Sequence, residues 1–281
     1  MSEPSRPWVL ITGCSSGIGK ALVGVCRAAG WGVVATARHW PDLADLPDGE
    51  DLRRLGLDVT SPDSLADAVA GCSGLRLVAL INNAGYGQMG PLEFVRPEEL
   101  RAQFETNVVG LQAVTNAFLP LIRKNAARGE GRIVQVASML GRLSIPLAGP
   151  YNASKHAVVA LAETLRLEIG REIPVVLVEP GAVASSFRDT IAKTWGDLPD
   201  RVQGTPYARI LANFIRTRKR QAERYAGSPE QAARRILKAL TRKHPPRRIL
   251  IRPEARLAGW AKAILPAAVW EWFLRRSYGL N

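Results

Sequence analysis

Thr12-Gly13-Cys14-Ser15-Ser16-Gly17-Ile18-Gly19 is the stretch of sequence that decides the fold. It follows the apolar run Trp8–Thr12, which is typical of a buried strand, and it leads into helical spacing of apolar residues over Gly17–Ala29. The first glycine permits a sharp turn, the second lets the backbone approach a pyrophosphate, and the third allows close packing of helix on strand. The helix N-terminus then offers its N–H groups to phosphates. A tight turn without a ligand can look the same, but the order of strand, turn and helix favours a dinucleotide site.

Strand-like and helix-like patterns alternate along the rest of the chain. Apolar runs predict strands at Trp8–Thr12, Gly32–Ala37, Leu55–Val59, Leu75–Ile81, Arg132–Ala137, Pro174–Val178 and Arg248–Ile251. Helical spacing predicts helices at Gly17–Ala29, Ser61–Val69, Glu98–Asn125, Tyr151–Arg171 and Pro229–Arg242, with Ser61 as the N-cap of the second. Because strands alternate with helices, the predicted fold class is α/β, a Rossmann-type doubly wound parallel sheet.

The same series predicts the domain organisation. No repeat or low-complexity linker interrupts it, so a single Rossmann-type domain is predicted over residues 1–255. Inside that domain, residues 185–226 are interpreted as an irregular, polar stretch. Residues 256–281 are predicted to form an amphipathic, helical C-terminal extension.

Composition excludes several classes of protein. The chain has 281 residues, of which 47% are hydrophobic and 22% charged, so it is neither disordered, coiled-coil, collagen-like nor polytopic in a membrane. Its three cysteines cannot build a disulfide framework, and its three histidines have no ligand spacing, so no metal site is predicted. The N-terminus has no basic segment followed by a long apolar run, so we expect a cytoplasmic protein.

The net charge of +13 is unevenly distributed. Residues 1–184 carry 17 basic and 18 acidic side chains, whereas residues 185–281 carry 21 basic and 7 acidic ones. A neutral body with a basic, tryptophan-bearing last third fits an anionic membrane surface or an acidic ligand better than nucleic acid.

Further short motifs follow the glycine stretch in a fixed order. They are Asp58-Val59 at the end of the third strand, Asn82-Asn83-Ala84-Gly85 at the end of the fourth, Asn107 at the start of the next helix, Ser138 after the fifth strand, Tyr151-x-x-x-Lys155 in the following helix, and Pro180-Gly181 after the sixth strand. Together with Thr-Gly-x-x-x-Gly-x-Gly, this series resembles the short-chain dehydrogenase/reductase family over about residues 6–252. The resemblance implies a nicotinamide-dependent oxidoreductase.

Tyr151 and Lys155 are the centre of the predicted catalytic set. Four residues apart in a helix, they share one face, and a neighbouring ammonium lowers the pKa of a phenol. Tyr151 can then protonate a carbonyl oxygen, or take the proton of an alcohol, while Ser138 hydrogen-bonds the same oxygen. The resemblance implies that Lys155 also binds the nicotinamide ribose and that Asn107 holds a water that relays protons to Lys155. Outside such a series, a Tyr-x-x-x-Lys pair is usually a surface tyrosine and a solvated lysine.

Arg38 decides the predicted cofactor. Preference for NAD normally needs an acidic residue at the end of the second strand, and no Asp or Glu occurs between Val33 and Trp40. A guanidinium suits a 2′-phosphate, so NADP is predicted over NAD. Asp58 either accepts from the adenine amino group or serves as a turn residue at the end of its strand. The resemblance leaves Asn82 to pin neighbouring strands and places Ser185 where the family usually has threonine. The predicted cofactor-binding residues are Gly13, Ser15, Ser16, Gly17, Ile18, Gly19, Arg38, Asp58, Val59, Asn83, Gly85, Tyr151, Lys155, Pro180, Gly181, Val183 and Ser185.

The predicted substrate is a small hydrophobic alcohol or ketone. The resemblance implies that residues 185–226 form a lid, and the residues expected around the site are apolar, namely Met89, Leu140, Leu143, Ile145, Pro146 and Leu147. The glycine motif, the Ala-Thr-Ala-Arg end of the second strand and the chain length most resemble the branch that acts on steroids and retinoids. The alternative is a catalytically silent nucleotide-binding protein that acts as a sensor or assembly module. The complete set of Asn107, Ser138, Tyr151 and Lys155 favours the enzyme.

Two interpretations of the C-terminal extension stay open. Residues 256–276 combine aliphatic and aromatic side chains with four basic residues, and Lys262, Pro266 and Glu271 interrupt them, so the segment is too broken to span a bilayer. It can lie in the interface of an anionic membrane. It can equally pack on its own domain or on a partner subunit of a homo-oligomer. No recognition motif points to nucleic acid.

Overall fold

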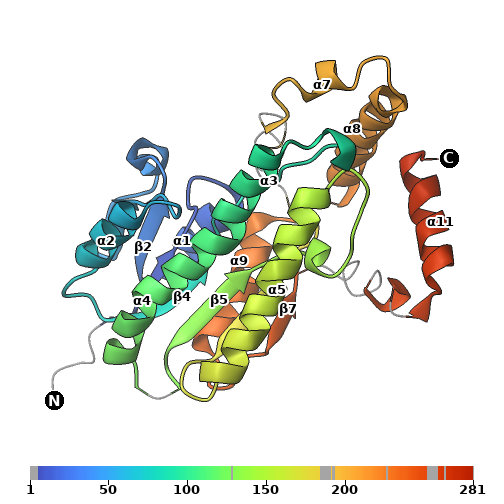
Figure 1. Cartoon of the computed structure of the whole chain (residues 1–281). Helices are drawn as coiled ribbons and strands as arrows, with labels where there is room; N and C mark the ends of the chain where they lie inside the picture. Colours follow the sequence, from blue (N-terminus) through green and yellow to red (C-terminus); the bar gives the residue numbers. More distant parts are fainter. Residues whose placement is uncertain are drawn as a thin grey trace.

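The computed structural model describes residues 6–127, 129–183, 191, 194–225, 227–251, 259–262 and 264–280. These residues form a parallel sheet of seven strands at the centre of the protein (Figure 1). The strands are β1 (Trp8–Ile11), β2 (Gly32–Ala37), β3 (Leu52–Gly56), β4 (Leu77–Asn82), β5 (Arg132–Val136), β6 (Val175–Glu179) and β7 (Arg248–Leu250). They are ordered β3-β2-β1-β4-β5-β6-β7. The predicted fold class is therefore confirmed.

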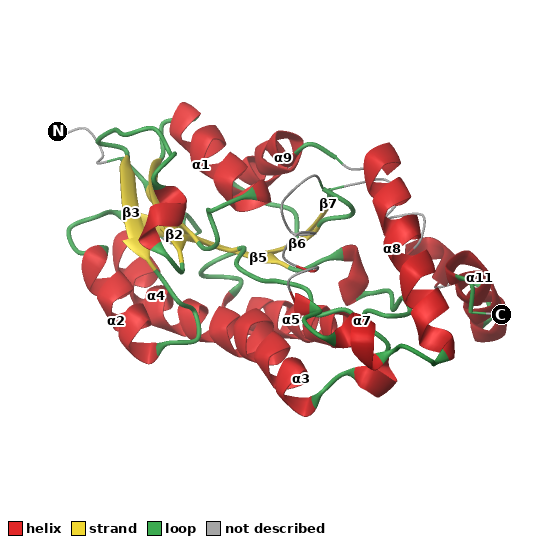
Figure 2. Cartoon of the chain, turned by 90° about the horizontal axis from the view of Figure 1, so that it is seen from above, coloured by secondary structure: helices red, strands yellow, loops and turns green. Residues whose placement is uncertain are grey.

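Helices cover both faces of the sheet (Figure 2). On one face lie α1 (Gly17–Ala28) and α9 (Pro229–Thr241), which pack against each other. On the other lie α2 (Pro62–Gly71), α4 (Leu111–Asn125) and α5 (Gly149–Ile169). Because the central strands are covered on both sides, they are buried along their whole length, and two apolar clusters fill the spaces between sheet and helices.

The third strand lies three residues earlier than predicted. Pairing with β2 ends where Ala37 meets Gly56, so the predicted strand Leu55–Val59 is wrong in its second half. Leu57 and Val59 are buried because they pack into the cluster under α2 and α4. Their apolar character reflects that packing rather than a place in the sheet.

One continuous helical run spans residues 97–125. It consists of α3 (Pro97–Phe104), a π-helical segment (Glu105–Gly110) and α4. The prediction that Asn107 opens a helix is wrong, because this residue lies within the π-helical segment. Wide turns of this kind are frequent at functional sites.

Helices also form at the rim, beyond the carboxyl end of β6. Short α7 (Leu198–Arg201) leads to the long helix α8 (Pro206–Tyr225), and α11 (Ala267–Tyr278) lies beside α8 at the edge of the molecule (Figure 1). The interpretation of residues 185–226 as irregular is therefore wrong for α8. Its apolar side chains Tyr207, Ile210, Leu211 and Phe214 do have helical spacing, but the exposed Arg209 lies between them and Arg216 and Arg220 follow. No helix among the described residues is long and apolar enough to cross a membrane.

Candidate active site

The glycine turn after β1 has the backbone that a phosphate site needs. Gly13 and Gly17 have φ values of +72° and +57°, a region that favours glycine. A Cβ on Gly13 would lie 2.9 Å from the Ala84 Cα, and one on Gly19 would lie 2.0 Å from the Gly13 carbonyl oxygen. Ser16 begins α1 without a side-chain capping bond, and the first turn of α1 has no acidic residue. The turn therefore leaves the positive end of α1 open to an anionic group such as a pyrophosphate.

Asn83 braces this turn from the end of β4. Its Nδ2 donates to the carbonyl oxygens of Thr12 and Gly13, at 2.9 and 3.0 Å. The Thr12 hydroxyl accepts the backbone N–H groups of Asn83 and Ala84, both at 2.9 Å. Asn83, which the sequence predicts as a cofactor-binding residue, thus also holds the glycine turn in place. Thr12 shares this structural role and was not among the predicted residues. Asn82 pins strands as expected, since its Nδ2 donates to Thr115 on α4 and Gln135 on β5.

Arg38 follows β2 directly and is exposed. Its charge acts on two other side chains, Asp58 and Tyr86. Its charge helps to lower the pKa of Asp58, although the main cause is hydrogen bonding from the Thr60 N–H and hydroxyl. It also lowers the pKa of Tyr86, which burial raises more strongly. Among the described residues Arg38 forms no hydrogen bond or ion pair. Its guanidinium is therefore available to a ligand that lies between β2 and Asp58.

Tyr151 and Lys155 lie on one face of α5, and both are almost completely buried. The Lys155 Nζ is 5.8 Å from the centroid of the Tyr151 ring and donates to the Val136 carbonyl oxygen at 3.0 Å. Burial lowers the pKa of Lys155 from 10.5 to about 8. The side chain is still mostly an ammonium at neutral pH, so it can favour a phenolate at Tyr151.

Ser138 is held two residues beyond the end of β5. Its Oγ accepts the Leu140 N–H at 3.1 Å and caps the short 3₁₀-helix Met139–Gly141. The Met139 N–H donates to the Pro180 carbonyl oxygen, which ties this turn to the loop after β6. Because Oγ acts as the acceptor in the capping bond, its own hydrogen can point elsewhere.

Asn107 clamps the loop that follows β4. Its Oδ1 accepts the Tyr86 N–H at 3.1 Å, and its Nδ2 donates to the Tyr86 carbonyl oxygen at 2.9 Å and to the Ser154 hydroxyl at 3.2 Å. A Cβ on Gly85 would lie 3.0 Å from the Asn107 Oδ1 and 3.7 Å from the Lys155 Nζ. Gly85 thus keeps open the space between these two side chains.

Gln103 lies one turn before Asn107 and was missed in the sequence. Fully buried, it donates from Nε2 to the Tyr86 carbonyl oxygen at 3.0 Å and accepts the Gln88 N–H at 2.5 Å. The signal was present, because residues four apart in a helix share a face. Gln103 and Asn107 together hold residues 86–88, and Asn107 ties them to α5 through Ser154.

The loop after β6 is the last of the segments that follow the carboxyl ends of the strands and carry predicted site residues. Pro180 is buried, Gly181 is half-buried, and Val183 pairs with Gly227 in a single β-bridge. Of the predicted residues on this loop, Ser185 lies outside the described part of the chain. The remaining predicted residues cluster where the parallel strands end, which is where this class of sheet binds its ligands.

The comparisons with known proteins agree with this geometry. Residues 7–195 match the family described as short chain dehydrogenase. The chain belongs to the short-chain dehydrogenase/reductase family. It is accordingly an oxidoreductase built on the Rossmann-type sheet, and the expectation of that family from the sequence is confirmed.

Three relatives can be aligned with nearly the whole length of this chain. The 3-ketodihydrosphingosine reductase of Bacteroides thetaiotaomicron is 34% identical over 281 residues, which covers 97% of this chain and 98% of the relative. The NADPH-dependent 3-dehydrocapnine reductase of Ornithobacterium rhinotracheale is 30% identical, and the match covers 92% of this chain and 93% of the relative. The 17-beta-hydroxysteroid dehydrogenase type 6 of Rattus norvegicus is 31% identical, and the match covers 93% of this chain and 86% of the relative.

A solved structure supports the same assignment. The short chain dehydrogenase/reductase of Burkholderia phymatum, in complex with NAD, is 27% identical and has a TM-score of 0.78, covering 94% of this chain and 96% of the other. The family uses NAD(P), and the open N-terminus of α1 behind the glycine turn suits the pyrophosphate of such a dinucleotide.

An apolar cluster surrounds Tyr151 in this family member. It includes the predicted residues Met89, Leu140, Leu143, Ile145 and Leu147. The rim adds Ile191, Trp195, Tyr207, Ile210 and Phe214, and the C-terminal segment adds Trp270, Leu274, Tyr278 and Leu280. The C-terminal residues thus belong to the same cluster as Tyr151. A substrate that reaches Tyr151 therefore meets mainly apolar side chains.

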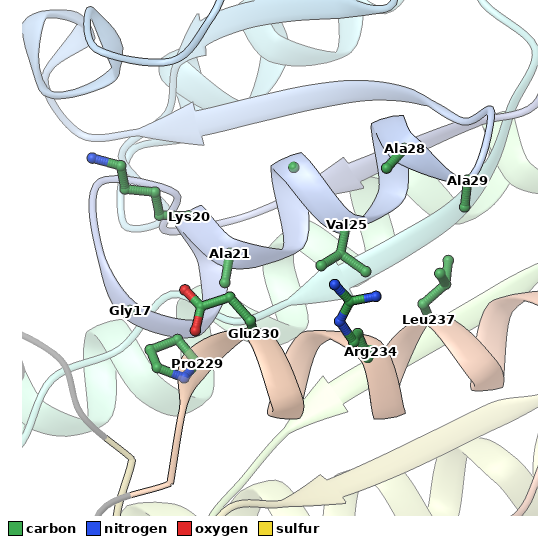
Figure 3. Close-up of a pocket in the computed structure, with 11 residues that line it drawn as sticks. Gly17, Lys20, Ala21, Val25, Ala28, Ala29, Pro229, Glu230, Arg234 and Leu237 are labelled. Carbon is green, nitrogen blue, oxygen red and sulfur yellow. The ribbon is translucent and has the colours of Figure 1, made fainter.

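A separate groove of about 610 Å³ lies between α1 and α9 (Figure 3). Ala21, Val25 and Ala28 line it from α1, and Glu230 and Arg234 from α9. None of the candidate catalytic residues lines it. It is thus not the site at which Tyr151 acts.

Proposed function

We propose that the protein is an NADP(H)-dependent oxidoreductase that transfers a hydride between nicotinamide and a hydrophobic alcohol or ketone. The observation that carries the proposal is the buried pair Tyr151 and Lys155. Tyr151 belongs to an apolar cluster, and the Lys155 Nζ lies close to Gly85 in the loop after β4. The dinucleotide supplies the hydride, and the protein supplies position and electrostatics.

In the direction of reduction, the Tyr151 hydroxyl gives its proton to the carbonyl oxygen of the substrate. The Lys155 ammonium stabilises the phenolate that remains, and its bond to the Val136 carbonyl oxygen keeps it beside the ring. The Ser138 hydroxyl donates to the same substrate oxygen, because its Oγ already serves as acceptor for Leu140. Oxidation reverses these proton movements.

Asn107 is proposed to act on Lys155 through the loop that it holds. Its side chain fixes Tyr86 and bonds Ser154, the residue before Lys155, so it sets the distance between the loop after β4 and the catalytic helix. A water in the space beside Gly85 would join Asn107 and Lys155 and could carry the proton onward.

The proposed preference for NADP(H) depends on Arg38. Its exposed guanidinium faces the region between β2 and Asp58, where a 2′-phosphate would lie, and no acidic side chain competes for the ribose hydroxyl. One relative is named as NADPH-dependent.

The proposed substrate class depends on the apolar cluster around Tyr151. Apolar lining favours a substrate with little polar surface beyond the reacting oxygen. The names of two relatives, a 3-ketodihydrosphingosine reductase and a hydroxysteroid dehydrogenase, denote bulky, lipid-like substrates. Long-chain ketones and steroid ketones are therefore the first to test.

The experiment measures oxidation of NADPH with a series of long-chain and steroid ketones, for the wild type and for Tyr151→Phe. We expect turnover in the wild type and a loss of about a thousandfold in the variant, with the NADPH dissociation constant changed less than about threefold. Tyr207→Phe is the matched control, because its hydroxyl bonds Glu93 on the rim instead. A Tyr151→Phe variant that keeps a tenth of the wild-type rate would place the proton donor elsewhere.

A further inference from the structure

Helix α11 has two apolar faces, of which only one is covered. Trp270, Leu274 and Tyr278, spaced one turn apart, pack into the cluster that contains Tyr151. The Tyr278 ring stacks on Phe214 of α8, with 5.8 Å between centroids. The inner face is therefore part of the domain, which bears out the interpretation that the extension packs on its own chain.

A second set of apolar side chains, here called the outer apolar face, is exposed. Val269, Trp272 and Phe273 belong to α11, and Trp260, Ile264 and Leu265 belong to the segment just before it. Their exposed fractions range from 40% to 72%. Figures 1 and 2 both place α11 at the rim of the molecule, and no described element lies beyond it. Six large apolar side chains on one short segment form an unusual surface for a protein in water.

Positive charge surrounds this face. The Arg276 guanidinium lies 6.0 Å from the Trp272 ring, and Arg275 and Lys262 are exposed on the same segment. Glu271 is the only acidic residue between Gly259 and Leu280. The neighbouring helix α8 carries further exposed arginines, among them Arg216 and Arg220, so this edge of the molecule is basic.

We propose that the outer apolar face docks the protein on an anionic lipid bilayer. Tryptophan and phenylalanine side chains enter the boundary between headgroups and acyl chains, while the flanking cations meet the lipid phosphates. A second copy of the chain is a poorer occupant. A two-fold contact through this face would bring Arg275, Arg276 and Lys262 of both copies together, and like charges would repel.

Docking through this face would orient the active site toward the membrane. The same helix touches lipid with Trp272 and Phe273 and covers the cluster around Tyr151 with Trp270 and Leu274. An apolar substrate dissolved in the bilayer would then reach Tyr151 past α11 without crossing water. This consequence rests on the proposed function, whereas binding to lipid does not.

Co-sedimentation of the full chain with vesicles tests the docking. We expect it to pellet with phosphatidylcholine vesicles that contain about one-third phosphatidylglycerol, and to do so less at high salt. Phosphatidylcholine vesicles alone should retain much less protein. The double variant Trp272→Ser with Phe273→Ser should weaken binding at least about tenfold, because it removes apolar burial. Arg275→Glu with Arg276→Glu should weaken it at least about 25-fold on anionic vesicles, because each lost basic residue accounts for about fivefold and each new carboxylate is repelled.

Two control variants change similar side chains elsewhere. Leu167→Ser removes an apolar side chain on α5 that is 88% exposed, and Lys124→Glu reverses an exposed charge at the end of α4. Both should bind vesicles as the wild type does. Thermal unfolding of every variant verifies the fold, and the serine double variant should reduce a water-soluble ketone at the wild-type rate.

Several results would overturn the proposal. They are full-length protein that stays in the supernatant with anionic vesicles, equal binding to neutral vesicles, or equal weakening by the controls. A change of mass in light scattering for the serine double variant would show instead that the face joins two copies of the chain. Because sedimentation needs no turnover, a failure to reduce any ketone would refute the proposed function and leave this result standing.

Discussion

Gly19 and Gly24 lie on the same helix and offer a matched test of the glycine turn. A Cβ on Gly19 would lie 2.0 Å from the Gly13 carbonyl oxygen and 2.6 Å from the Asn83 Nδ2. A Cβ on Gly24 would meet no atom within 4 Å. Gly24 lines the groove between α1 and α9, where there is room for a methyl group. The same substitution to alanine should therefore have opposite effects at the two positions.

The expected destabilisation by Gly19→Ala follows from these contacts. The Gly13 carbonyl would have to move by more than an ångström to reach ordinary contact at about 3.4 Å. Such overpacking costs about 1–3 kcal/mol. The shift would also stretch the two bonds from Asn83, each worth about 1 kcal/mol. Alanine recovers about 1 kcal/mol of helix propensity, so the free energy of unfolding should fall by about 2–4 kcal/mol.

Gly24→Ala should instead raise the free energy of unfolding by about 0.5–1 kcal/mol, because only the propensity gain applies. Urea unfolding of the apoprotein at neutral pH measures both changes. Fluorescence titration with NADPH should show a dissociation constant at least about tenfold higher for Gly19→Ala, since the turn that faces the phosphates has moved, and an unchanged one for Gly24→Ala. Equal unfolding midpoints and equal affinities for the two variants would refute this account of the turn.

Three further variants test other parts of the site. Arg38→Asp should raise the NADPH dissociation constant at least about tenfold and lower that of NADH, and an unchanged preference in fluorescence titrations would mean that other residues select the cofactor. Burial lowers the pKa of Lys155 to about 8. Between that value and 10.5 the unfolded chain binds a proton that the folded apoprotein has released, so stability should rise with pH by up to about 3 kcal/mol. Lys155→Met should lack this rise in urea unfolding measured at both ends of the window. Arg248→Met should cost about 3 kcal/mol, because it leaves the buried Glu179 with only Arg142 at 3.8 Å, and adding Glu179→Gln should restore part of the loss in the same assay.

Local patterns in the sequence were enough to predict the turn, most elements and the shared helix face of Tyr151 and Lys155. The glycine spacing, the Ser61 cap and the four-residue spacing of Tyr151 and Lys155 each depend on atoms only a few residues apart. Since strands alternate with helices, the parallel sheet follows, and its carboxyl edge gathers the residues that end each strand. The sequence by itself thus determined the fold class and the family.

Only the tertiary structure decided how distant segments complete the site. Asn83 braces a turn 71 residues away, and Glu179 is buried against Arg248, 69 residues further on. Helix α11 packs one face against the cluster of Tyr151 and leaves the other exposed. Both faces are apolar, so their pattern in the sequence is the same. Which one is buried depends on the position of α8 and of the rim, and that position is set by contacts between residues far apart in the chain.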